Sequence, residues 1–282
     1  MATRRSTRCR TRSRTSDRGE GAGAASPRPR AGYSEMLVEY LLRLGDTGLV
    51  LGHRLSEWCG HGPALEEDMA LTNIALDLVG QARLFLTYAG EVEGKGRTED
   101  DLAYLRDAYD YRNLLLVEQP NGDFAHTIAR QFLFDAFNVG LMAELTGSRD
   151  DRLAAIAAKS LKEVTYHVRH SSEWVIRLGD GTGESRARTE AALDDLWAYT
   201  GEMFAMDDVD EAMVAAGIGV DLAALKPDWD RRVDGVLAEA TLARPADGWM
   251  QSGGKRGRHG EHLGHLLAEM QFLQRAYPGA TW

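Results

Sequence analysis

The 282-residue sequence has little of what several protein classes need. It contains only two cysteines, Cys9 and Cys59, so no disulfide framework can form and a reducing compartment, the cytoplasm, is expected. No run of about 18 consecutive apolar residues occurs, which argues against a membrane span. Sustained alternation of apolar and polar residues is also missing. We therefore expect no β-sheet.

Basic residues are scarce beyond the first 34 positions. Residues 1–34 hold nine Arg against two acids, whereas the rest carries 24 basic and 41 acidic residues, a net charge of about −17. An acidic body argues against binding of nucleic acid. The first 34 residues lack an apolar run that would offset the entropy of ordering them. We expect a disordered basic tail at 1–34 and one domain at 35–282.

Three interpretations of the tail stay open. Its Arg-rich, Ser-rich and acid-poor composition is typical of an organelle transit peptide. A basic arm can also contact nucleic acid. The favoured interpretation is a start codon assigned too early, with Met36 as the true start, because helical patterning begins there.

Apolar residues recur every three or four positions along most of the body, which is the period of a helix surface. One such stripe contains Leu37, Leu41, Leu44, Leu51, Leu55 and Trp58. With the turn signals between stripes, the pattern predicts further helices over about 64–93, 99–109, 123–145, 150–178, 184–206, 207–216, 221–240 and 260–276. Asp123 is the expected N-cap of its helix. Four long helices in two hairpins, joined by residues 95–122, predict an all-α, four-helix bundle with additional peripheral helices.

A di-iron carboxylate bundle takes one carboxylate from each of two helices and a Glu-x-x-His motif from each of the other two. Four of these six positions carry a donor here: Glu57, Asp77, Asp135 and His167. Gly80 and Val164 stand where a His and a Glu belong. Loss of a ligand from both halves predicts that no dinuclear centre forms. The four remaining groups are expected to be buried and to partner one another.

An unusual metal site is the alternative. Glu163 and His167 are four residues apart, so both can face the same side of a helix. A mononuclear site on this pair stays open, although a satisfied polar cluster is favoured.

A glycine-rich basic turn precedes the last predicted helix. It carries Lys255, Arg256 and Arg258, and such a turn can hold an anion on the backbone N–H groups of a helix N-terminus. No Walker pattern accompanies it, so a capped surface turn or a contact between subunits is favoured over a phosphate site. If the chain contacts an anionic ligand at all, these three side chains are the expected contacts.

Several strings resemble one family. They are Leu44-Gly45-Asp46, Glu57-Trp58-Cys59-Gly60-His61, Asp77-Leu78-Val79-Gly80-Gln81-Ala82-Arg83, Asn113-Leu114-Leu115-Leu116-Val117-Glu118-Gln119-Pro120-Asn121-Gly122 and Glu261-His262-Leu263-Gly264. Together they are similar to the structural C subunits of the phenylacetate-CoA oxygenases, the ring-1,2-phenylacetyl-CoA epoxidases. The resemblance covers nearly all of residues 36–282. His126, His265 and the tail depart from it.

The resemblance implies a ferritin-like fold without a metal centre, with no catalytic residue and no cofactor in this chain. It implies a partner, the catalytic A subunit, which carries the di-iron site and the CoA-thioester pocket. A reductase with flavin and an iron–sulfur cluster supplies electrons to such a complex, which epoxidises the ring of phenylacetyl-CoA during aerobic phenylacetate breakdown. Two other functions stay open: a di-iron monooxygenase with its own atypical site, and a helical interaction protein outside phenylacetate metabolism.

Overall fold

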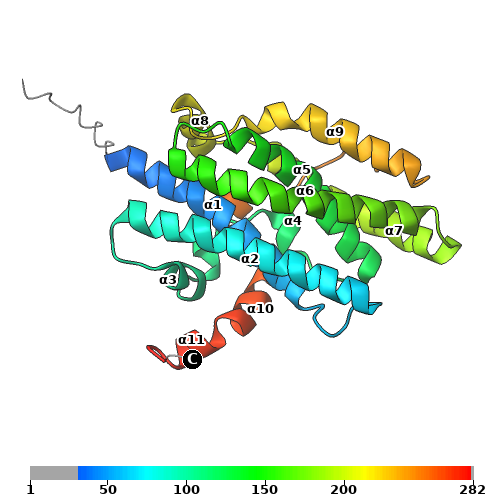
Figure 1. The fold of residues 1–282 in the computed structure, drawn as a ribbon, viewed down its shortest axis with the longest axis horizontal. Helices are drawn as coiled ribbons and strands as arrows, with labels where there is room; N and C mark the ends of the chain where they lie inside the picture. The colour runs from blue at the N-terminus through cyan, green and yellow to red at the C-terminus, as the bar shows by residue number, and fades with distance from the viewer. Residues whose placement is uncertain (1–30, 281–282) are drawn as a thin grey trace, which may run out of the picture.

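The computed structural model describes residues 31–280, and every regular element in this range is helical (Figure 1). The four long helices are α1 (Ala31–Ser56), α2 (Leu65–Glu93), α5 (Phe124–Leu145) and α6 (Asp151–Gly179). The shorter ones are α3 (Glu99–Tyr104), α4 (Leu115–Glu118), α7 (Gly183–Trp197), α8 (Asp208–Ala215), α9 (Leu222–Glu239), α10 (Glu261–Met270) and α11 (Phe272–Ala276). Three short 3-10 segments are η1 (Ala108–Asp110), η2 (Gly201–Phe204) and η3 (Gly254–Arg256). The all-α prediction is confirmed for this part of the chain.

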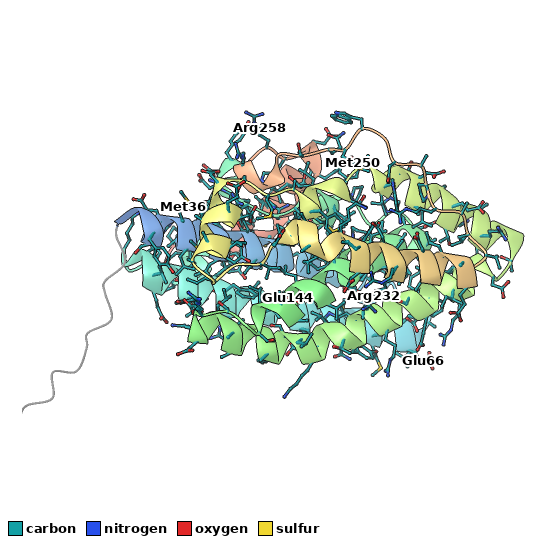
Figure 2. All side chains as sticks on the ribbon, turned by 90° about the horizontal axis from the view of Figure 1, so that it is seen from above. Met36, Glu66, Glu144, Arg232, Met250 and Arg258 are labelled. Atoms are coloured by element: carbon teal, nitrogen blue, oxygen red, sulfur yellow. The ribbon has the colours of Figure 1, made fainter. Side chains whose placement is uncertain are left out.

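The long helices form two hairpins. Helix α1 packs along α2, α5 packs along α6, and the hairpins meet where α2 contacts α6 (Figures 1 and 2). Helices α7 and α9 cover α5 and α6, and α8 lies against α1. The C-terminal helices α10 and α11 lie beside α1 and η1, away from the α5–α6 hairpin (Figure 1).

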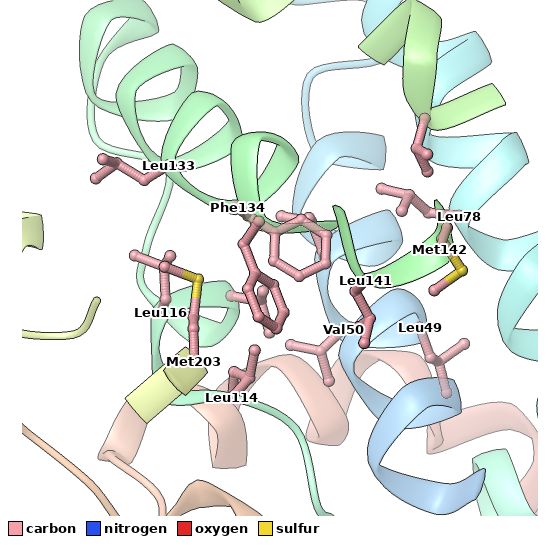
Figure 3. Packing of buried hydrophobic residues seen from close by; sticks show 14 of the residues in the cluster. Leu49, Val50, Leu78, Leu114, Leu116, Leu133, Phe134, Leu141, Met142 and Met203 are labelled. Atoms are coloured by element: carbon pink, nitrogen blue, oxygen red, sulfur yellow. The ribbon is translucent and has the colours of Figure 1, made fainter. Parts of the chain in front are cut away.

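The core lies between the two hairpins. Four members of the predicted stripe on α1 are buried: Leu37, Leu41, Leu51 and Leu55. Figure 3 shows Val50 of α1, Leu78 of α2 and Phe134 and Leu141 of α5 around one part of this core. Helix α5 is buried on nearly all sides, because α4, α6, α7 and α9 surround it. This position explains why its sequence shows no broad polar face.

Several helix ends are explained by local capping residues. The Asp123 carboxylate accepts the backbone N–H of His126 at 2.9 Å, which confirms the predicted N-cap of α5. Asp150 caps α6 in the same way by accepting the N–H of Leu153 at 2.9 Å. Helix α2 ends at Gly94, whose φ of 69° lies in the left-handed region that favours glycine.

Other boundaries differ from the prediction. Helix α1 begins at Ala31, inside the predicted tail, and ends at Ser56, so Glu57 and Trp58 lie beyond it; the rest of the predicted tail, residues 1–30, falls outside the described residues. Helix α3 ends at Tyr104 rather than near 109, because the Arg106 guanidinium turns inward to the buried Asp46. The predicted 184–206 and 260–276 helices are each broken in two, and α4 was not predicted.

Helix α2 is more apolar than the sequence analysis indicated. By length and composition alone it is the one helix in residues 31–280 that qualifies as a membrane span, a test that core helices of soluble proteins also pass. Its inner face, with Leu71, Ile74, Leu78 and Ala82, is buried in the core.

Candidate functional site

The carboxylate of Asp135 is satisfied entirely by its own chain. Asp135 is fully buried on α5, where Gln131 Nε2 donates to Oδ1 at 2.7 Å and Ser171 Oγ of α6 donates to Oδ2 at 2.8 Å. Burial raises the pKa of Asp135 to about 8, and the two hydrogen bonds only partly offset that effect. Both oxygens of this buried carboxyl group are therefore engaged by side chains of α5 and α6.

His167 and Asp77 form the one predicted pair that the structure brings together. His167 Nε2 lies 3.1 Å from Asp77 Oδ2. The His167 side chain is fully buried, whereas that of Asp77 is 37% exposed between α2 and α6. Burial lowers the pKa of His167, and the nearby Asp77 carboxylate opposes that shift. The pair therefore joins an imidazole in the core to a carboxylate that is partly exposed.

The two positions without donors have different surroundings. Val164 is fully buried in the apolar core, so a carboxylate there would have to displace packing. Gly80 is half-buried, and a Cβ added to it would meet nothing within 4 Å. A larger side chain would therefore fit at Gly80, but glycine itself supplies no donor atom.

The prediction that Glu57 joins a buried cluster is wrong. Glu57 follows the last residue of α1 and is exposed, and its carboxylate accepts from Arg54 Nη1 at 2.9 Å and Asn121 Nδ2 at 2.8 Å. Because the helix ends one residue earlier, the side chain lies in a turn outside the core. The expected four-membered cluster is thus reduced to the Asp77–His167 pair and a separately satisfied Asp135.

Glu163 does not complete a mononuclear site. Its Oε2 accepts from Gln81 Nε2 at 2.9 Å and its Oε1 from Lys159 Nζ at 2.7 Å. Within residues 31–280, no group of three or more His, Cys, Asp or Glu side chains is placed to hold a metal ion. The described residues therefore do not fit a di-iron centre or the atypical alternative.

The glycine-rich turn binds a carboxylate of the same chain. The buried Glu202 accepts from the N–H groups of Gly253 and Gly254, both at 2.7 Å, through Oε1, and from the N–H of Leu115 at 2.8 Å through Oε2. A Cβ on Gly254 would collide with the Asn113 carbonyl oxygen, so only glycine fits. The backbone donors that suggested an external anion are occupied by the protein's own carboxylate.

Two of the three basic side chains of this turn are also paired. Lys255 Nζ lies 3.1 Å from Asp210 and donates to the Ala205 carbonyl at 2.7 Å. Arg256 is exposed and reaches Asp207 at 3.3 Å. Arg258 is exposed at the edge of the molecule (Figure 2). This pairing leaves Arg258 as the member of the predicted trio best placed for an external contact.

A second buried carboxylate, missed by the sequence analysis, fixes the next stretch of chain. Glu118 is fully buried and accepts from Asn113 Nδ2 at 3.0 Å, from the Gly260 N–H at 2.7 Å and from His259 Nδ1 at 2.8 Å. His259 Nε2 lies 3.0 Å from the Tyr111 carbonyl oxygen. Burial lowers the pKa of His259, but these two acceptors outweigh it and the pKa is raised overall.

The sequence offered a weak signal for one of these carboxylates. Glu118 directly follows the apolar run Leu114–Val117, where an acid is out of place unless it is partnered. Glu202 has no comparable signal, because its partners lie 51, 52 and 87 positions away along the chain. Both acids have a structural role in anchoring residues 253–260.

Comparison with known proteins identifies the family of this chain. The family model described as phenylacetic acid catabolic protein matches residues 23–282. The C subunit of the 1,2-phenylacetyl-CoA epoxidase from Escherichia coli (strain K12) is 53% identical over 246 residues, which cover 87% of this chain and 99% of that protein. The chain therefore belongs to the family of phenylacetic acid catabolic proteins.

Proposed function

We propose that this chain is the non-catalytic structural subunit of a phenylacetyl-CoA 1,2-epoxidase and supports a separate di-iron catalytic subunit in aerobic phenylacetate catabolism. The observation that carries the proposal is the set of hydrogen bonds made by Asp135. Its two carboxylate oxygens accept from Gln131 and Ser171, while Gly80 and Val164 supply no donor. These observations support a helical scaffold that is kept while the donors of a di-iron site are lost.

The two long hairpins support a ferritin-like four-helix arrangement with peripheral helices. On this proposal the chain carries no cofactor. Iron belongs to the catalytic A subunit, and flavin and iron–sulfur chemistry belong to the reductase. A hetero-oligomer in the cytoplasm is the corresponding setting, and the relative's description as a subunit supports it.

The test is metal content and mass of the full chain, purified alone and after co-expression with the catalytic subunit of the same epoxidase. We expect no stoichiometric iron in the chain alone and a stable, iron-bearing hetero-oligomer after co-expression. Epoxidation of phenylacetyl-CoA should require both chains. The matched control is the catalytic subunit purified alone, which shows how much activity it retains without its partner.

Two results would contradict the proposal. Iron near two per chain in the isolated protein would support the alternative, a ferritin-like monooxygenase with its own atypical site. A catalytic subunit that is fully active without this chain would remove the structural role.

A further inference from the structure

A cavity of about 50 Å³ lies inside the helical body, where the two hairpins meet. Helices α1, α2 and α5 supply most of its walls, and the segments that cover them supply the rest. Protein interiors are close-packed and contain few voids larger than a water molecule, which needs about 10–15 Å³. The cavity therefore has more room than one water fills, and it is large enough for a small ligand.

Most of the cavity wall is apolar. Six of the buried side chains that form it are labelled in Figure 3: Leu78, Leu114, Phe134, Leu141, Met142 and Met203. A water molecule inside a protein needs roughly two to four polar partners, which these six side chains do not offer. A small apolar molecule needs none, and it gains by leaving bulk water. The wall therefore favours an apolar occupant over a cluster of waters.

The cations at the cavity are already neutralised by carboxylates of the same chain. The cations that line it are Arg43, Arg112 and Lys255. Their respective distances to Asp207, Glu39 and Asp210 are 2.8, 2.6 and 3.1 Å. A charged ligand would lose its hydration without gaining a free counter-ion, which is costly. The ligand that fits this cavity is therefore uncharged.

One hydrogen-bond donor at the cavity is left for a ligand. Arg43 Nε is buried and has no hydrogen-bond partner within residues 31–280, although Nη1 and Nη2 both donate to Asp207. Glu39 Oε1 lies 3.9 Å from Nε, which is too far for a hydrogen bond. A buried donor without a partner indicates an additional bound molecule. One charged N–H on an otherwise apolar wall suits a small molecule with lone pairs.

We propose that this cavity is a binding site for dioxygen. Dioxygen is uncharged and apolar, it carries lone pairs, and it is far smaller than benzene, which fits an apolar cavity of roughly 150 Å³. The choice of dioxygen rests on the proposed function, because aerobic epoxidation takes its oxygen atom from dioxygen. The lining residues Leu44, Arg112 and Lys255 are partly exposed, so they mark where a small molecule enters. The chain would hold the oxidant without transforming it.

The test measures methyl relaxation in the full chain under dioxygen, which is paramagnetic, with nitrogen as the diamagnetic reference. Leucine methyl groups carry the 13C label. Leu78 and Leu114 are buried and line the cavity, whereas Leu55 and Leu263 are fully buried elsewhere in the core. We expect the relaxation rate induced by dioxygen to be several-fold larger at Leu78 and Leu114 than at Leu55 and Leu263. Equal rates at all four leucines would overturn the proposal.

Two variants of one wall residue locate the site. Leu141→Phe places a larger side chain in the cavity, whereas Leu141→Ile conserves the side-chain volume. The excess relaxation at Leu78 and Leu114 should be lost in Leu141→Phe and kept in Leu141→Ile. An excess that survives in a folded Leu141→Phe would overturn the assignment to this cavity. The comparison within the wild-type chain decides the proposal even when a variant does not fold.

Water is the competing occupant. Cross-relaxation from water to the Leu78 and Leu114 methyl groups, without an excess under dioxygen, would show that water fills the cavity and would overturn the proposal. These measurements need neither iron nor a partner chain. A negative result therefore leaves the proposed function intact, and failure of the proposed function shows itself separately in metal content and assembly.

Discussion

Replacing Glu202 by Gln removes a charge from a buried cradle of three backbone donors. The carboxylate accepts from Gly253, Gly254 and Leu115 at 2.7–2.8 Å. A hydrogen bond to a charged group contributes about 1.5–3 kcal/mol, and a buried donor left unpaired costs about 1–3 kcal/mol. The amide keeps one oxygen and turns an NH2 group toward at least one N–H. We expect a loss of about 3 kcal/mol in the free energy of unfolding.

Thermal unfolding and limited proteolysis measure this effect. For a domain of this size, about 3 kcal/mol corresponds to a fall in Tm of about 6–12 °C. Trypsin should also cut faster after Lys255, Arg256 and Arg258, since the segment they lie on loses its anchor. Glu239→Gln is the matched control, because Glu239 is exposed at the end of α9. Equal Tm values and equal cleavage rates for the two variants would refute the anchoring role of Glu202.

Three further predictions concern two buried titratable groups, Asp135 and His259, and the buried Val164. The pKa of Asp135 lies above its ordinary value of 3.8, so the folded state holds a proton that the unfolded state releases, and stability should fall as the pH rises from about 4 toward 8. Asp135→Asn should therefore gain stability over the wild type in urea melts at pH 8 and not at pH 4; a gap independent of pH would contradict this. The pKa of His259 is raised above 6.5, so its pairing with Glu118 stabilises fully below that pH and is lost as the pH rises through the raised value. His259→Gln should flatten that part of the stability profile, and an unchanged profile would show that the pair does not titrate there. Val164→Glu should cost on the order of 3 kcal/mol by burying an unpaired acid, without raising the iron content measured by plasma emission; bound iron would show that one missing ligand was enough.

The long helices could be predicted from the sequence because a helix is determined largely by residues close to one another along the chain. The stripe from Leu37 to Leu55 and the cap at Asp123 depend on residues within a few turns of one another. Spacing alone also led to the prediction that Gly80 and Val164 stand where a di-iron protein has a His and a Glu, and this stays a prediction. The relative from E. coli then confirmed the family that the sequence strings had indicated.

The failures came from boundaries and from long-range pairs. Glu57 was placed in the core because the first helix was extended two residues too far, and one residue beyond a helix end is enough to turn a side chain toward solvent. The basic turn was interpreted as a possible anion site because its geometry was recognised correctly while its occupant, Glu202, lies some 50 positions away. No local pattern encodes such a partner.

The hydrogen bonds by which Glu118 and Glu202 anchor residues 253–260 also affect when the chain can finish folding during its synthesis. Glu118 accepts a hydrogen bond from the N–H of Gly260, which lies 142 positions downstream. Glu202 accepts hydrogen bonds from the N–H groups of Gly253 and Gly254, which lie 51 and 52 positions downstream. Until Gly260 has left the ribosome, Glu118 has the donor from Asn113 but lacks the one from Gly260, so the residues around it are not fully anchored during synthesis. Contacts between residues so far apart in sequence have a high entropic cost of loop closure, and they form slowly during folding. A ribosome stalled near residue 250 would thus hold a chain in which Glu118 and Glu202 still lack their donors from residues 253–260, and a chaperone or an assembling partner would have access to this region at that stage.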